Sequence, residues 1–302
     1  MGEKLKVNLK ALVFIAGLII VLIIPDIFRV VIIPRRKYDE AVILMNNGQY
    51  DEAELAFNEL ENRCFYRVED CRYNRAVMLM ERGNYTDAMQ IFRFMDGYRE
   101  SYKMMHDIYF KYGYISCLDV GEDFLFGHAD NGKSYKWKIL DVSGDRALII
   151  ATEAVEKCAY SWVDCSTENE ETWENCHLRS WLNSDFIENT FVTEERDRIL
   201  LTCVEADANP DWRCSTDQGG NTADRAFLLS INEVNKYLTE ESDRKCWNEG
   251  GIYYYDSWWL RNTGVYQDYA AVVRASDGEI LCCGANRYTE CLVRPAMWIK
   301  IR

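Results

Sequence analysis

An internal repeat near the start of the chain constrains the fold more than any other feature. The segment YDEAVILMNNGQYDEAELAFNEL begins at Tyr38, and YNRAVMLMERGNYTDAMQIFRFM begins at Tyr73 in the same register. Alanines at matching positions let two helices approach closely, and Gly48 and Gly83 stand where a first helix has to end and turn. A tyrosine then starts a second helix in each copy. The repeat therefore predicts two helical hairpins.

The length and pattern of this repeat resemble tetratricopeptide repeats, which recur about every 34 residues. The resemblance covers two units and a terminal helix over 97–113, so we assign residues 38–113 to a short all-α repeat region. Two repeats make little concave surface for a peptide. A simple spacer and a scaffold that binds protein partners are both open readings of this region.

An uncharged apolar run, ALVFIAGLIIVLIIP, extends from Ala11 to Pro25. A helix that crosses a bilayer needs about 20 apolar residues, and the run reaches that length from Val7 if Lys10 snorkels to the interface. No small-residue cleavage motif follows, which favours a retained anchor over a cleaved signal peptide. We therefore predict a membrane anchor and basic connector over residues 1–37, with the membrane as a partner and a single-pass topology.

Charge and cysteine content narrow the class of protein. The net charge of −14 argues against nucleic acid as a partner, because such binding requires a basic surface. Basic residues flank the apolar run on both sides, so charge alone does not orient it. The 12 cysteines favour an extracellular main body, although their spacing fits no zinc motif. Disulfides and reduced buried thiols remain equally open.

After Gly113 the pattern changes to short strands and helices. A hairpin is predicted where a Ser-Gly-Asp turn joins the segments SYKWKILDV and RALIIATEAV. A helix is predicted for CHLRSWLNSDFIENTF, because its apolar residues have helical spacing. Ser230 and Glu233 form a predicted capping box. Three later strands are expected in YAAVVRAS, EILCCGA and VRPAMWIKI. Helices and antiparallel hairpins are interspersed, so residues 114–302 should form an α+β domain with an antiparallel sheet.

Several motifs in this domain resemble a bacterial domain of unknown function. They are WENCHLRSWLNSDFIENTF, RAFLLSINEVNKYL, SWWLRN, AAVVRASDGEI and VRPAMWIKI, in this order between about residues 117 and 302. That domain is frequent in Gram-positive surface and membrane proteins and is similar to C-type-lectin-like and sulfatase-modifying-factor folds. The resemblance implies a recognition or scaffolding module, with the Trp-rich strand at the centre, and implies no established reaction.

Signatures of catalysis and metal binding are weak in this sequence. It has no G-x-S-x-G elbow, Walker loop or H-E-x-x-H motif, and its three histidines lie far apart, so we predict neither a catalytic residue nor a metal ligand. Asp207, Asn209 and Asp211 open like a calcium loop, but Trp212 stands where such a loop needs glycine. A calcium site of a type other than the EF-hand remains an alternative. Apart from calcium, we expect no cofactor.

The best ligand-binding candidates lie in two loops between predicted strands near the C terminus. The loops are NTGVYQDY and ANRYTE, and they carry Tyr266, Asp268, Asn286, Arg287 and Tyr288. This mixture of aromatic and polar side chains suits adaptable contacts, although ordinary solvated loops share it.

These observations lead to one functional hypothesis and two alternatives. We expect a membrane-anchored, extracellular, non-enzymatic protein that presents a lectin-like domain to a protein or glycan ligand. One alternative is an envelope scaffold that binds protein through the helical repeats. The other is an oxidase of the modifying-factor type, for which Cys282, Cys283 and Cys291 would supply a reactive thiol.

Overall fold

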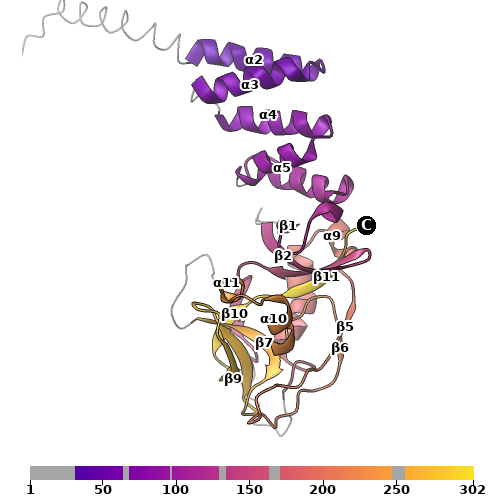
Figure 1. Cartoon of the computed structure of the whole chain (residues 1–302), viewed down its shortest axis with the longest axis vertical. Coiled ribbons are helices and arrows are strands. Elements are labelled where there is room, and N and C mark those ends of the chain that lie inside the picture. The colour runs from indigo at the N-terminus through magenta and orange to yellow at the C-terminus, as the bar shows by residue number, and fades with distance from the viewer. Residues whose placement is uncertain (1–30, 64–67, 96, 129–133, 163–170, 247–255) are drawn as a thin grey trace, which may run out of the picture. The chain divides into compact units, whose positions relative to one another are not determined.

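The computed structural model describes residues 31–63, 68–95, 97–128, 134–162, 171–246 and 256–302. It divides between Ile108 and Tyr109 into two compact units (Figure 1). The first unit is helical, and the second combines sheets of mostly antiparallel strands with short helices, the pair β7–β10 being parallel. The α+β class expected for the C-terminal part is therefore present.

Paired helices build the N-terminal unit. They are α2 (Ile33–Asn46), α3 (Tyr50–Arg63), α4 (Val68–Glu81), α5 (Tyr85–Arg93) and α6 (Ser101–His106), followed by η2 (Asp107–Lys111) across the boundary. Gly48 and Gly83 have φ angles of 76° and 78°, a left-handed conformation that ends α2 and α4 at equivalent points. Each copy of the sequence repeat thus contributes two helices.

Equivalent residues of the two copies are buried in the same way. Tyr38 packs edge-on against Phe57, with ring centroids 6.2 Å apart, and Tyr73 packs against Phe92 at 5.9 Å. The copies are joined where Asn74 Nδ2 donates a 2.8 Å hydrogen bond to the Tyr38 hydroxyl. The repeat in sequence is therefore also a repeat in packing.

The predicted transmembrane helix requires correction. Of the helices that the model describes, none is long and apolar enough to cross a membrane. The run from Ala11 to Pro25, on which the prediction rested, lies outside the described residues. On this finding the predicted transmembrane helix is wrong. The predictions that depend on it, of the membrane as a partner and of a single-pass protein with an extracellular body, are wrong with it.

Three sheets make up the C-terminal unit (Figure 1). The four-stranded sheet has the order β1-β2-β3-β11, the five-stranded sheet β4-β10-β7-β8-β9, and β5 pairs with β6. The bounds of the first group are Asp123–His128 (β1), Ser134–Ser143 (β2), Arg146–Ala151 (β3) and Ala296–Lys300 (β11). Those of the second are Glu156–Ala159 (β4), Glu290–Val293 (β10), Ser257–Thr263 (β7), Tyr269–Arg274 (β8) and Ile280–Asn286 (β9), and those of the third are Thr202–Val204 (β5) and Thr222–Asp224 (β6).

Strand β7 lies at the centre of the five-stranded sheet and is covered on both faces. Trp258 and Trp259 alternate across the strand, yet both are fully buried. Trp258 Nε1 donates to the Arg244 carbonyl at 2.9 Å, and Trp259 Nε1 donates to the Cys158 carbonyl at 3.0 Å. The tryptophan pair is therefore part of the core and offers no open stacking surface.

Short helices complete the unit. They are η3 (Tyr114–Cys117), α7 (His177–Trp181), η4 (Leu182–Phe186), α8 (Ile187–Thr190), α9 (Thr193–Arg196), α10 (Ile231–Tyr237) and α11 (Glu241–Arg244). The capping box predicted for α10 is present: Glu233 N donates to Ser230 Oγ at 3.1 Å, and Ser230 N donates to Glu233 Oε2 at 2.9 Å. It places Glu233 against β7, where the polar network described next begins.

Candidate functional site

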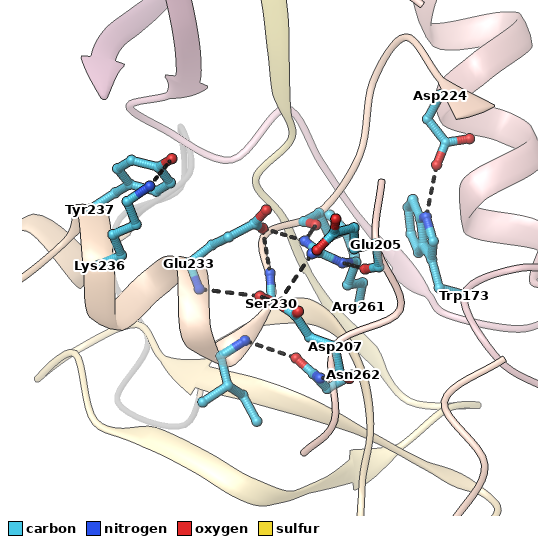
Figure 2. Close-up of polar contacts among 12 residues, drawn as sticks. Trp173, Glu205, Asp207, Asp224, Ser230, Glu233, Lys236, Tyr237, Arg261 and Asn262 are labelled. Carbon is cyan, nitrogen blue, oxygen red and sulfur yellow. Dashed lines mark hydrogen bonds and ion pairs between the residues drawn. The ribbon is translucent and has the colours of Figure 1, made fainter. Parts of the chain in front are cut away.

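A buried arginine on β7 organises the polar interior of the C-terminal unit (Figure 2). Arg261 is 4 % exposed and ion-pairs with Glu233 and, at 3.4 Å, with Asp207. It also donates to the carbonyls of Glu205 at 3.2 Å and Leu228 at 3.1 Å. Its charge and its donors are thus satisfied within the protein, which indicates a structural role.

The residues of the calcium-like loop are engaged with protein partners. Asp207 accepts from Ser230 and pairs with Arg261, while Asn209 donates to the Thr263 and Cys282 carbonyls at 2.8 and 3.0 Å. Asp211 pairs with Arg213 at 2.6 Å, and this partner lowers the Asp211 pKa to about 2. Within the described ranges no cluster of three or more His, Cys, Asp or Glu side chains is placed to hold a metal ion.

Cavities near these groups differ in what they can hold. The one beside Arg261 and Asn262 has a volume of about 10 Å³, which is room for one water at most. A second cavity of about 420 Å³ lies beside α8 and α9 and is large enough for a small molecule. Two guanidinium groups and two carboxylates line it, so it shows no preference for a charged ligand. These lining residues are Arg196, Arg225, Glu188 and Asp197.

The two loops predicted to bind ligand are held against each other. Asn286 Nδ2 donates to Asp268 Oδ2 at 2.8 Å, and the Arg287 amide donates to the Asp268 carbonyl at 2.9 Å. Tyr266 and Tyr288 are 63 % and 40 % exposed. The structure thus brings four of the predicted side chains to one rim at the β7–β8 and β9–β10 connections.

Arg287, the fifth predicted residue, points inward instead. It is 3 % exposed, and its carbonyl accepts from the amides of Tyr160 and Ser161 at 2.9 and 3.1 Å. These bonds join the β9–β10 turn to the segment after β4. Burial raises the pKa of Tyr160 well above its ordinary value, and the nearby Arg287 charge opposes that shift. Arg287 and Tyr160 are therefore neighbours in the interior, joined through the backbone.

Beside Tyr160 lie three functional candidates that were not predicted from sequence. Trp162 is 56 % exposed and stacks on His177, with ring centroids 5.7 Å apart and planes inclined by 29°. His177 Nδ1 lies 3.7 Å from a carboxylate oxygen of Glu171, which is buried. In the sequence, only the family-like motif WENCH, which contains His177, pointed to this region. No local sequence pattern links His177 to Trp162.

Cys176, next to this cluster, and two of the three cysteines considered for oxidase chemistry, Cys282 and Cys291, are poorly suited to act as nucleophiles. Cys176 caps α7, where its Sγ accepts from the Arg179 amide at 3.4 Å, and burial raises its pKa to about 12. Burial raises the pKa of Cys291 to about 12 as well, and it also raises that of Cys282. A reactive thiol needs a lowered pKa, so these three sites give no support to oxidase chemistry. No disulfide joins cysteines of the described residues.

Comparison with known proteins yields one match. A family model described as Domain of unknown function (DUF6273) matches residues 145–301, just over half of the chain. The matched range holds the Arg261 network, both candidate loops and the cluster around Trp162. No curated protein and no solved structure matches the chain.

Proposed function

The chain belongs to the family described as Domain of unknown function (DUF6273), and from that premise we propose that it is a non-enzymatic recognition protein. Its ligand would be a glycan or protein, bound at the rim of the two C-terminal loops. The observation that carries the proposal is the exposure of Tyr266 and Tyr288 on loops fixed by the Asp268–Asn286 hydrogen bond. Exposed tyrosines on a rigid support make large contacts at low entropic cost.

A lectin-like arrangement of the C-terminal unit is part of this proposal. It is supported by one antiparallel and one mostly antiparallel sheet, by the Trp-rich strand β7 at the centre of the latter, and by the closing strand β11 in the former. In this arrangement the loops that leave β7 and β9 carry the ligand site, while the strands below hold them in place. The buried pair Trp258 and Trp259 then has the structural role, and the exposed pair Tyr266 and Tyr288 has the binding role.

A glycan and peptide array probed with the full chain tests this function. We expect a bound ligand whose affinity falls at least about tenfold in Tyr266→Ala/Tyr288→Ala, since aromatic residues dominate binding at such surfaces. Trp212→Ala is the matched control, because Trp212 is 90 % exposed and lies on the loop between β5 and β6. Equal binding by the double variant and the wild type would rule out the rim as the site.

A second candidate function uses the helical repeats as a protein-binding scaffold. Apolar side chains favour it: Ile43, Leu55 and Phe94 are 58 %, 72 % and 86 % exposed. The tetratricopeptide-like reading of the hairpins belongs to this candidate. The same peptide array separates the two functions, because Leu55→Glu/Phe94→Glu would abolish binding here and leave binding at the loop rim unchanged.

A further inference from the structure

Among the residues that the structure describes, Arg287 is a buried cation without a counter-ion. Its side chain is enclosed to the same degree as those of Arg261 and Arg294, yet in the described chain it makes no hydrogen bond and no ion pair, and its Nε is fully buried. Arg294, by contrast, donates to the Ala151 carbonyl at 2.7 Å and to the Asp243 carbonyl at 2.9 Å. An uncompensated interior charge is among the most destabilising features of a fold.

The neighbouring groups do not neutralise this charge. The Tyr160 hydroxyl donates to the Arg261 carbonyl at 3.2 Å, and Cys176 is engaged as the cap of α7. Glu171, the carboxylate of this cluster, lies against His177 at 3.7 Å. His177 Nδ1 is itself enclosed without a hydrogen bond. Two buried nitrogens in one cluster thus lack an acceptor.

An aromatic surface covers His177. Trp162 covers the His177 ring on one face and is 56 % exposed. An indole that is half open and half stacked offers a flat apolar contact for a ring-shaped ligand. The cluster therefore combines an unmatched cation with a stacking surface, on the inner side of the turn that carries Tyr288.

We propose that this cluster, Trp162, Glu171, His177 and Arg287, binds a sugar acid, whose carboxylate pairs with the Arg287 guanidinium and whose ring lies on Trp162. The inference rests on the proposed recognition function and names the ligand class for it. A carboxylate matches the planar fork of a guanidinium. A phosphate dianion is disfavoured because Glu171 and a net charge of −14 repel the second negative charge.

Thermal unfolding of the full chain with four sodium salts or sugars at constant ionic strength tests the ligand class. Glucuronate has both a sugar ring and a carboxylate. Glucose has only the ring, acetate has only the carboxylate, and phosphate is the dianion control. We expect glucuronate to raise Tm by about 2–4 °C and the other three to raise it less. Trp162→Ala should reduce the glucuronate shift and Trp212→Ala should leave it unchanged. An absent glucuronate shift, or an equal shift with acetate or phosphate, would overturn the assignment.

Substitution of the arginine provides a second measurement that needs no ligand. Arg287→Met removes an unpaired charge and should leave Tm unchanged or raised, with no response to glucuronate. Arg294→Met removes a charge that is hydrogen-bonded to two carbonyls and should lower Tm. If Arg287→Met lowers Tm as much as Arg294→Met, the charge is already satisfied and the proposal is wrong. The array experiment with Tyr266→Ala/Tyr288→Ala tests only the proposed binding site at the loop rim. The sugar-acid site and the rim site can therefore be disproved independently of each other.

Discussion

Buried arginines show how differently single residues can be stabilised in one fold. Arg261 is held by carboxylates and carbonyls, whereas Arg294 is held by carbonyls and by the face of Trp258, 5.3 Å from its guanidinium carbon. Burial lowers the pKa of Arg294, as expected for a cation in the interior. Arg287 has neither kind of support. Of the three, Arg287 is therefore the one for which we propose a ligand.

Buried thiols should make the stability of the fold depend on alkaline pH. Burial raises the pKa of Cys158 and of Cys291, its cross-strand partner, from an ordinary 9.0 to about 12. Between about pH 9 and 12 the unfolded chain loses these protons and the folded chain keeps them. The unfolding free energy is therefore fully present below that window and should fall as pH rises through it.

Urea denaturation at a series of pH values from about 8 to 10.5 checks this expectation. Cys291→Ala should flatten the alkaline decline, because one of the raised groups is gone. Cys203→Ala is the control, since Cys203 is exposed. An identical decline in Cys291→Ala and in the wild type would contradict the assignment.

At the scale of elements, one close backbone approach fixes the predicted loop after β7. A Cβ on Gly264 would lie 2.4 Å from the Cys283 carbonyl oxygen and 2.8 Å from the Tyr269 Cβ. Both are rigid parts of neighbouring strands, so they cannot move aside. Gly264→Ala should lower the unfolding free energy by about 1–3 kcal/mol, as over-packing does elsewhere.

Chemical denaturation of Gly264→Ala beside Gly220→Ala measures this effect. At Gly220 a Cβ would meet the carboxylate end of Glu174 at 3.1 Å, which is a flexible side chain. The control should therefore be close to the wild type. Equal stability of the two variants would show that the strands can separate.

Elements with strong local signals could be predicted from sequence, and those set by distant contacts could not. The Ser230–Glu233 box predicted α10, and the run YAAVVRAS predicted β8. Strand β10 was missed because its four residues have no alternation of their own and are defined by pairing with β4 and β7.

The candidate site shows the same division. The predicted rim residues lie in one loop pair, and their exposure follows from turn chemistry. The inward turn of Arg287 and the stacking of Trp162 on His177 depend on chain segments far apart in sequence. No spacing rule relates these residues, so only the folded structure brings them together.

At the scale of the whole molecule, the two units should respond separately to core mutations. All nine tryptophans lie after Gly113, so tryptophan fluorescence reports on the C-terminal unit alone, whereas circular dichroism reports on both. Phe57→Ala removes a fully buried ring from the helical unit. It should lower the stability of that unit by about 3–5 kcal/mol and shift only the dichroism transition.

The converse variant completes the test. Trp137 is fully buried in the C-terminal unit, and its Nε1 donates to the Phe126 carbonyl at 2.7 Å. Trp137→Ala should shift the fluorescence transition. If Phe57→Ala shifted fluorescence by as much as dichroism, the units would unfold as one.

The pairing of β3 with β11 and of β4 with β10 joins the first strands of the C-terminal unit to its last. During synthesis the ribosome releases the early strands long before their partners exist. Val293, which pairs with Glu156, and Ile299, which pairs with Ala147, emerge long after their partners. Both sheets can thus be completed only once β10 and β11 have emerged, and until then the nascent chain displays unpaired strand edges to chaperones.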